Sequence, residues 1–328
     1  MPLNVDRPKK PLEKAKVTAK ASPLDGLNKH RRFNAPLARL LSKDPLTRDT
    51  AIAIANCSQR LSLQFELKGE ELRNPKLLNG ILCNRRLCPF CEWRRTRALR
   101  AKLIQGLRLH ATENPKTTAI FLTLTVKNCH ILELRNTIKH LHYSYKRLTL
   151  IKGFPTNIWF RRTEVTIGKN QMGHASIIPA QFHPHIHILL LVRPSYWGRE
   201  YWSQLRWQQE WQMAARLNYS PIVDVKRAYT KQSRSKRGLD GTLAATLEAA
   251  KYSTKASDLL KLGDHLPDFH MEMKNLRLYG ISSNLKKYIG STSLDTEELL
   301  DHNQPSDENS FHAMAQWFDT IQEYQFIL

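Results

Sequence analysis

The chain has 328 residues, enough for one large domain or two ordinary ones that each bury a core without staples. Its formal net charge of +22 and isoelectric point near 9.9 attract polyanions, so nucleic acid is the first partner to consider. Five cysteines indicate no disulfide scaffold, and no apolar run is long enough for a membrane span or a signal peptide. We therefore expect a soluble protein of the reducing cytoplasm, without a membrane partner.

Charge divides the chain into a basic body and an acidic end. Residues 1–48 hold twelve basic and four acidic residues with little apolar periodicity, which predicts a disordered basic arm. The last 38 residues hold eight acidic residues and no lysine or arginine, so residues 1–290 carry a net charge of +30. We expect this acidic tail, within a C-terminal region of residues 266–328, to be a separate module. Its final stretch, 311–328, has the pattern of an amphipathic helix.

Residues 49–115 are predicted to form a small zinc-binding module that ends in a basic helix over 94–108. The four expected zinc ligands are Cys57, Cys83, Cys88 and Cys91. Four thiolates suit a closed tetrahedral Zn²⁺ site, and clustered cysteines in a cytosolic protein favour a metal over a disulfide. Because the spacing departs from paired CxxC motifs, buried free cysteines are the alternative. Cys129 is left over and is expected to be structural.

Residues 116–265 are predicted to form an α+β domain. Strands are expected over 119–126, 158–167, 183–192 and within 221–227, with helices over 131–150 and 197–217. This β-α-β-β-α-β order resembles an antiparallel sheet of ferredoxin-like, split βαβ order with flanking helices. A basic loop over 230–241 then precedes a predicted helix over 242–262. On the second helix, Trp202, Trp207 and Trp211 are interpreted as core residues rather than as platforms that stack on bases.

In the segment HPHIHILLLV, His185 and His187 lie two residues apart. Side chains alternate between the faces of a strand, so both imidazoles point to the same side. Imidazoles bind divalent transition metals, and Glu164 on a neighbouring strand would complete a three-ligand site with open positions for substrate oxygen. We expect Mn²⁺ or Mg²⁺ there. The alternative is a pair of exposed strand histidines, and His183, next to a proline, is expected to be a loop residue.

The segment TLEAAKYSTK supplies a second group of candidate catalytic residues, Tyr252, Glu248, Lys251 and Lys255. Residues four apart share one face of a helix, so Glu248 and Tyr252 can meet at one substrate. A phenol with a pKa of about 10 is a poor nucleophile, but a nearby lysine or a metal-polarised phosphate offsets this and allows a covalent phosphotyrosine. The alternative is a surface helix with a Glu248–Lys251 pair and a half-buried tyrosine.

Together these motifs resemble the HUH endonucleases, and within them the replication initiators of small bacterial rolling-circle plasmids. The resemblance covers about residues 57–258: FLTLTV with Asn128 is similar to the first family motif, HPHIHILLLV to the metal motif and LEAAKYSTK to the nucleophile motif. It implies that His185 and His187 bind the metal and that Tyr252 is the nucleophile. Glu164, in an EVT segment, would be the third ligand. Family members also carry similar cysteines before the first motif.

The resemblance implies transesterification on single-stranded or hairpin-exposed origin DNA. Tyr252 would attack a scissile phosphate, remain linked to the 5′ end and release a 3′-hydroxyl that primes synthesis. Glu248, standing where other branches carry a second tyrosine, would activate water so that replication ends by hydrolysis. Host helicase and polymerase are the implied protein partners.

DNA affinity is expected from two basic segments. Their candidate DNA-binding residues are Arg94, Arg95, Arg97, Arg100, Lys231, Arg234, Lys236 and Arg237. Two other classes of protein fit part of the pattern. An HUH transposase or relaxase shares the chemistry, but many such transposases carry two tyrosines four apart. A non-enzymatic, zinc-containing DNA-binding protein shares the charge and has no need of the His, Glu and Tyr set.

Overall fold

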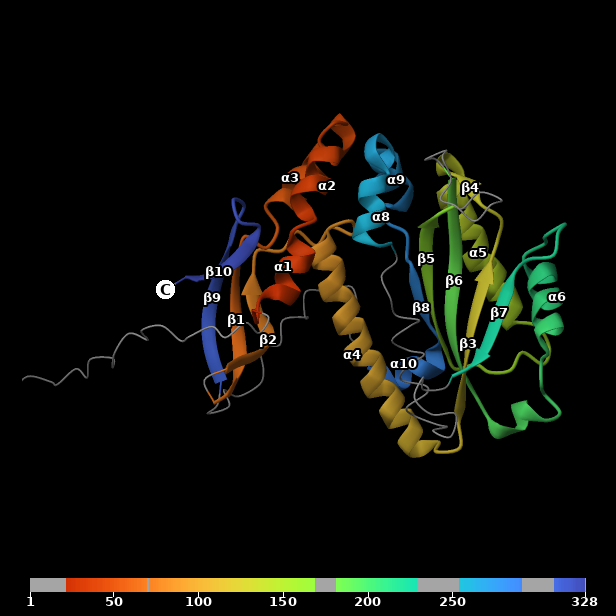
Figure 1. Cartoon of the computed structure of the whole chain (residues 1–328). Helices are drawn as coiled ribbons and strands as arrows, with labels where there is room; N and C mark the ends of the chain where they lie inside the picture. The colour runs from red at the N-terminus through yellow and green to blue at the C-terminus, as the bar shows by residue number, and fades with distance from the viewer. Residues whose placement is uncertain (1–21, 70, 169–180, 229–253, 291–309, 328) are drawn as a thin grey trace, which may run out of the picture. The chain divides into compact units, whose positions relative to one another are not determined.

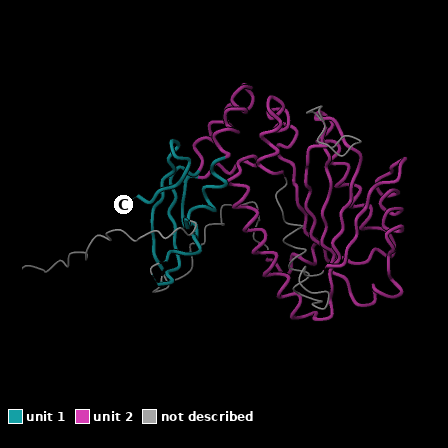
Figure 2. The backbone as a smooth tube through the Cα atoms, viewed as in Figure 1, with its two compact units in different colours: residues 1–32, 58–81, 300–328 teal, residues 33–57, 82–299 magenta. Residues whose placement is uncertain are grey.

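The computed structural model describes residues 22–69, 71–168, 181–228, 254–290 and 310–327. The chain divides into two compact units (Figure 2). Unit 1 comprises residues 1–32, 58–81 and 300–328, and unit 2 comprises residues 33–57 and 82–299. Both units contain α-helix and an antiparallel sheet, which confirms the predicted α+β class.

Unit 1 contains a four-stranded antiparallel sheet in the order β10-β9-β1-β2 (Figure 1). Its described elements are α1 (Asp25–Arg31), β1 (Arg60–Lys68), β2 (Glu71–Gly80), β9 (Ser310–Phe318) and β10 (Glu323–Ile327). Alternate residues of β1 and β9 are buried on one face, including Leu61, Leu63, Ala315 and Trp317. These apolar residues form the core of unit 1.

The described residues near the two ends of the chain differ from the sequence prediction. The helix expected over 311–328 is wrong, because β9 and β10 form a hairpin whose first strand pairs with β1. That strand is more than 240 residues away in sequence, so local periodicity carried no sign of the pairing. The acidic tail is therefore not a separate module, since residues 310–327 complete the sheet of unit 1.

The disordered arm predicted over 1–48 is wrong for its second half. Residues 25–31 form α1, and helix α2 (Asn34–Leu41) follows directly. Both helices bury leucines, among them Leu27 and Leu41, and apolar burial of this kind favours an ordered segment in spite of its basic charge.

Unit 2 is built on a sheet in the order β7-β3-β6-β5-β8, with every pair antiparallel and β4 added beside β6. The strands are β3 (Thr118–Thr125), β4 (Cys129–His130), β5 (Trp159–Ile167), β6 (Gln181–Val192), β7 (Val223–Arg227) and β8 (Tyr279–Ile281). Within the described residues, the remaining helices are α3 (Arg48–Ala55), α4 (Pro89–Glu113), α5 (Leu134–Thr149), α6 (Gln204–Ala214), α8 (Ala256–Lys261), α9 (Leu266–Met273) and α10 (Ser283–Ile289). Short 3-10 turns span Pro45–Thr47, Ile131–Glu133, Pro194–Trp197 and Gly263–His265.

Helices pack on both faces of this sheet (Figure 1). On one face, Ile186 and Ile188 of β6 pack with residues of α5 and α6, including Trp207 and Trp211. On the other face, Leu189 belongs to a cluster with leucines of α4 and α10. Burial on both sides explains why β6 ends in an unbroken apolar run rather than an alternating one.

Most predicted elements of unit 2 are confirmed, with shifted boundaries. The basic helix predicted over 94–108 is the longer α4, and the helix predicted over 197–217 is reduced to α6 and a preceding 3-10 turn. The three tryptophans are core residues as predicted, each at most 1% exposed. Of the helix predicted over 242–262, the part before residue 254 lies outside the described residues.

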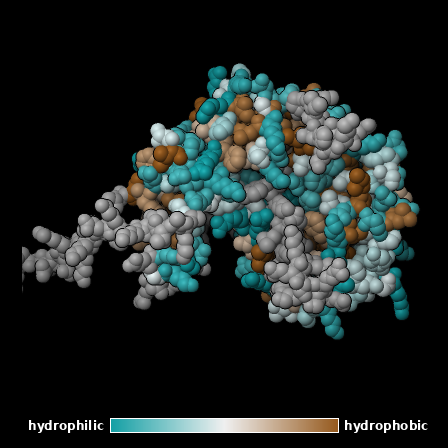
Figure 3. Space-filling model, in the orientation of Figure 1, coloured by the Kyte–Doolittle hydropathy of each residue, from teal (hydrophilic) through white to brown (hydrophobic). Residues whose placement is uncertain are grey.

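Figure 3 shows hydrophilic residues over much of the visible face, with hydrophobic residues in separate patches. Within the residues that the structure describes, no helix combines the length and the apolar character that crossing a membrane requires.

Candidate metal centre and cysteine cluster

Glu164, His185 and His187 meet at one point on the sheet of unit 2. Glu164 of β5 pairs directly with His185 of β6, and His187 follows on the same face. The Oε2 atom of Glu164 lies 2.9 Å from Nε2 of His187 and 3.5 Å from Nε2 of His185. Ligands about 2.1 Å from an octahedral ion stand about 3 Å apart, so these separations suit a small divalent cation.

The second nitrogen of each ring is also engaged. Nδ1 of His185 lies 3.1 Å from the backbone carbonyl of His183, and Nδ1 of His187 lies 3.1 Å from Oγ1 of Thr123. A carbonyl oxygen only accepts, so Nδ1 of His185 donates to it and Nε2 is the nitrogen that faces Glu164. A ring nitrogen that faces a carboxylate oxygen is favourable only when a cation or a proton lies between them. The donor set therefore fits a metal ion, with ring orientations fixed as in known metal sites.

The carboxylate of Glu164 is suited to act as a ligand at neutral pH. Burial raises its pKa, but the hydrogen bonds and charges of His185 and His187 outweigh that effect and hold the pKa well below the ordinary value. The three side chains are between 11% and 15% exposed, so the site is accessible from solvent. These residues can hold a divalent cation and leave positions open for a substrate oxygen.

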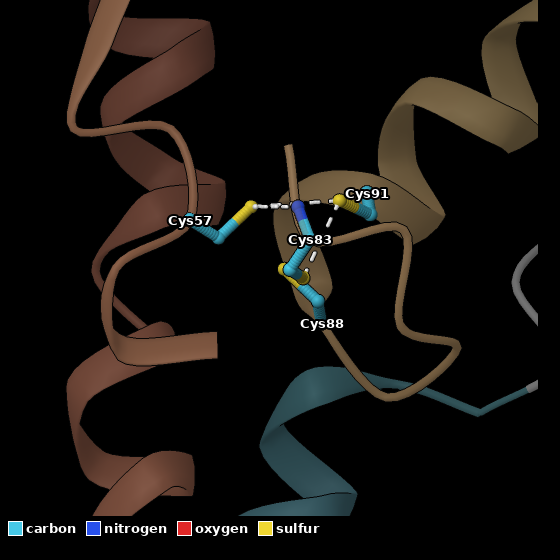
Figure 4. Close-up of side chains that lie close together, drawn as sticks. All are labelled: Cys57, Cys83, Cys88 and Cys91. Carbon is cyan, nitrogen blue, oxygen red and sulfur yellow. Dashed lines mark hydrogen bonds between the residues drawn. The ribbon is translucent and has the colours of Figure 1, made fainter. Parts of the chain in front are cut away.

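Four cysteines form a second cluster in unit 2, and Figure 4 shows their side chains converging. Cys57 follows α3, Cys83 follows β2, and Cys88 and Cys91 lie at the beginning of α4. The sulfur of Cys91 lies 3.5 Å from that of Cys57 and 3.7 Å from that of Cys83. Zinc–sulfur bonds of about 2.3 Å place the sulfurs of a tetrahedral site about 3.8 Å apart, close to both distances.

The surroundings of the cluster favour the deprotonated, thiolate form of some of its cysteines. The backbone amide of Cys83 donates to the sulfur of Cys57, and hydrogen bonds from the other three cysteines hold the pKa of Cys57 far below its ordinary value. Burial has the opposite effect on Cys88 and raises its pKa. The amide nitrogen of Asn34 lies 3.6 Å from the Cys88 sulfur. Cys129 is buried outside the cluster.

Several sequence-predicted residues lie outside the described part of the chain. Among the candidate catalytic residues these are Tyr252, Glu248 and Lys251, and among the candidate DNA-binding residues they are Lys231, Arg234, Lys236 and Arg237. Lys255 is described: it is exposed and precedes the first turn of α8.

The four arginines of α4 that were named as DNA-binding candidates have different surroundings. Arg94 and Arg95 both donate to Asn84, in the loop between Cys83 and Cys88. Arg97 is exposed and packs its guanidinium over the ring of Trp93 at 5.2 Å, and Arg100 is half-buried. At least two of the four therefore contribute to the structure of the cysteine loop.

Sequence reasoning missed three polar residues around these sites, Thr123, Glu92 and Arg162. Thr123 contacts a ligand ring, while Arg162 and Glu92 form a buried ion pair between β5 and α4. The position of Arg162 beside the metal centre could have been predicted from the sequence, because side chains alternate along a strand and a residue two positions before Glu164 shares its face. No local pattern indicated a role for Glu92, because its partner Arg162 lies 70 residues away in the sequence.

Comparison with known protein families gives one family match. The model described as "Replication protein" matches residues 74–325, most of the chain. No solved structure matches the chain.

Individual relatives agree with this match. The chain is 30% identical over 261 residues to a "Protein rep" of Streptococcus pneumoniae serotype 2, covering 76% of this chain and 77% of that protein. It is 29% identical over 297 residues to a "Protein rep" of Bacillus amyloliquefaciens, covering 83% of each. A "Protein rep" of Lactiplantibacillus plantarum is 32% identical over 207 residues, which are 62% of this chain and 61% of that protein.

Proposed function

Because the chain belongs to the family of replication proteins, we propose that it initiates rolling-circle replication of a small bacterial plasmid by nicking one strand at the origin. The observation that carries the proposal is the meeting of Glu164, His185 and His187 on adjacent strands. A binding protein has no need of three convergent ligands with open positions, whereas a nuclease that acts on phosphodiesters does.

The sheet is consistent with an HUH-type nuclease of ferredoxin-like, split βαβ order. Its elements follow one another as β3-α5-β5-β6-α6-β7, and the four strands lie side by side as β7-β3-β6-β5. The two central strands are thus β3 and β6. They carry Thr123 and both histidines, which keeps the ligands on the most firmly held part of the sheet.

In the proposed reaction, Tyr252 is the nucleophile. Its hydroxyl loses a proton and its oxygen forms a bond to the scissile phosphorus as the bond to the 3′ oxygen breaks; the 3′ oxygen takes up a proton and leaves as a hydroxyl that primes synthesis. A divalent cation, Mn²⁺ or Mg²⁺, would withdraw charge from the phosphate. Lys251 and Lys255 supply positive charge near the tyrosine. Glu248 takes a proton from water in the closing step, so the second cleavage does not need the occupied tyrosine.

Trapping of the covalent complex tests this proposal. Supercoiled plasmid carrying the origin is incubated with the protein and Mn²⁺, and nicking and protein linked to the 5′ end are both measured. Tyr252→Phe should abolish both while origin binding persists, because only the nucleophilic oxygen is removed. Tyr201→Phe, at a tyrosine that is 50% exposed, is the matched control and should react normally. Adduct formation by Tyr252→Phe at the wild-type rate would disprove the assignment.

Glu248 has its own test on a template with two origins. Glu248→Ala should nick normally but release few unit-length single-stranded circles, because water is activated only in the closing step. An unchanged ratio of release to nicking would assign that proton transfer to another residue.

We also propose that the cysteine cluster holds one structural Zn²⁺. The support is the fit of the sulfur separations to a tetrahedral site and the burial of Cys57, Cys88 and Cys91. Elemental analysis should find about one zinc per chain, lost in Cys88→Ser and retained in Cys129→Ser. Equal zinc contents in the two variants would contradict the assignment.

A further inference from the structure

The two clusters of ligands are joined by a chain of polar contacts, which runs from a partly buried ion pair to an exposed hydrogen bond. Helix α4 begins within the cysteine cluster, and Glu92 directly follows Cys91. Oε1 of Glu92 accepts a hydrogen bond from Nη2 of Arg162 at 2.5 Å. The two side chains are 13% and 7% exposed, among the least exposed of the ion pairs that the structure describes.

Arg162 reaches this contact from the metal centre. It lies on β5 opposite His187 of β6, and it shares a face with Glu164 two residues later. Its Nη2 atom also lies 3.5 Å from the hydroxyl of Thr96, one turn further along α4. The strand that carries the candidate carboxylate ligand is therefore fastened to the first two turns of α4.

Glu92 continues the chain toward the cysteines. Its other carboxylate oxygen accepts from Nη1 of Arg95 at 3.2 Å. Nη2 of Arg95 donates to the backbone carbonyl of Asn84, in the loop between Cys83 and Cys88. One carboxylate thus bridges Arg162 of the sheet and Arg95 of α4, and Arg95 in turn contacts the cysteine loop.

We propose that Glu92 and Arg162 are positioning residues that couple the cysteine cluster to the metal centre. The inference rests on the proposed function for the occupants, Zn²⁺ in the cysteine cluster and a divalent cation at Glu164. A buried charge cannot lose its partner without a large cost, so the loop, the start of α4 and β5 keep one arrangement together. Loss of zinc releases the loop, lets Glu92 move, and displaces Glu164 from the position in which it meets both histidines.

The coupling is tested by Mn²⁺ binding, measured by calorimetry on the full-length, zinc-loaded protein. Glu92→Gln should weaken Mn²⁺ affinity about tenfold, as loss of a supporting partner does at other metal sites. Arg162→Lys retains the charge but not the planar fork, so a smaller loss is expected. The control is Glu113→Gln, which removes a carboxylate from the far end of the same helix, where it binds the Tyr288 hydroxyl.

A positioning role also predicts rescue. Nicking by Glu92→Gln should recover at higher Mn²⁺ concentration, whereas nicking by His187→Ala should not, because that variant lacks a ligand. Mn²⁺ affinity equal in Glu92→Gln, Glu113→Gln and wild type would overturn the coupling and leave the proposed function intact. Failure of the wild type to bind Mn²⁺ more tightly than His187→Ala would instead overturn the metal centre itself.

The wild-type protein provides an independent measurement should the variants fold poorly. Coupling between two binding sites is reciprocal, so saturating Mn²⁺ should tighten zinc binding by the same factor by which bound zinc tightens Mn²⁺ binding. We expect a zinc-selective chelator to hold a smaller share of the zinc at equilibrium when Mn²⁺ is present, but not in His187→Ala. An equal share with and without Mn²⁺ in the wild type would refute the coupling.

Discussion

At the scale of single residues, the two candidate histidine ligands are oriented by different partners. A backbone carbonyl holds His185, whereas the hydroxyl of Thr123 holds His187. Since only the second partner is a side chain, only His187 can be released by a point substitution that leaves the ligands in place. Such outer partners set ring orientation and basicity at metal sites.

We therefore predict that Thr123→Val weakens Mn²⁺ affinity about tenfold, because the isosteric side chain no longer holds Nδ1 of His187. Thr125→Val is the matched control: it lies on the same strand and face, but its hydroxyl donates to the carbonyl of Ile222. Titration calorimetry compares the two. Equal Mn²⁺ affinities in both variants would show that Thr123 does not orient the ligand.

His142 makes the stability of the fold depend on pH. Its Nε2 lies 2.7 Å from Oγ1 of Thr163, and burial, followed by the charge of Arg161, lowers its pKa from 6.5 to about 3. Because the unfolded chain takes up the proton more readily, this contribution to stability is complete above about pH 6.5. It is lost progressively as the pH falls toward about 3.

His142→Asn should therefore lose less stability than the wild type between pH 7 and pH 5. The expected difference is up to about 2 kcal/mol, reduced by whatever solvent screens the ring. Urea unfolding at the two pH values measures it. An identical loss in both proteins would mean that the ring is protonated in the folded state.

At the scale of elements, the position of α4 depends on a small residue, Gly106, as well as on the Glu92–Arg162 ion pair. A Cβ atom at Gly106 would stand 2.6 Å from Cγ1 of Ile289 and 3.1 Å from the carbonyl oxygen of Tyr288, so α4 and α10 touch backbone to backbone there. The absence of a side chain lets α10 approach and complete the core on that face of the sheet.

Gly106→Ala should consequently destabilise unit 2 by about 1 to 3 kcal/mol, although alanine is the better helix former by about 1 kcal/mol. The comparison is Gly26→Ala on α1, where a Cβ meets nothing within 4 Å and a neutral or stabilising effect is expected. Thermal unfolding of both variants decides the matter. A stabilised Gly106→Ala would mean that α10 moves away without loss of packing.

At the scale of the whole molecule, the chain builds unit 1 from three separated segments. The last two strands complete a sheet begun by residues 60–80, so the core of unit 1 cannot form until the C-terminal segment has been made. Tyr324 takes part in this closure, since its hydroxyl donates to the carbonyl of Ser58 and its backbone amide donates to Asn28.

The register of β9 gives a sharp test of this arrangement. Ala315 is buried opposite Leu61, while the neighbouring Gln316 points to the other face, where its side chain accepts from Arg60. Ala315→Glu should cost about 3 kcal/mol or more, because it buries an unpaired charge, and Gln316→Glu should be tolerated. Hydrogen exchange of β1 amides reports on unit 1. Equal protection in the two variants would mean that β9 does not pair as described.

The sequence by itself determined the chemistry of the candidate sites. His185 and His187 share a face because strand geometry has a period of two, and Glu164 was placed on a neighbouring strand by the same pattern. The apolar residues of β3 and β6 are strong local signals, as is the spacing of apolar residues in α5. The grouping of the four cysteines was likewise predicted from their chemistry, and the structure brings their sulfurs together.

Only the tertiary structure decided which distant residues support those sites. The pairing of Arg162 with Glu92 and of β9 with β1 joins segments 70 and about 250 residues apart. Neither pairing can be predicted from the periodicity of the sequence, because the partner of an ion pair or of a strand depends on the three-dimensional path of the chain and on burial. The same dependence on a distant partner explains why a hairpin forms where a C-terminal helix was predicted. The apolar residues of 310–327 fit the period of a helix or of a strand, and pairing with the edge of β1 favours the strand.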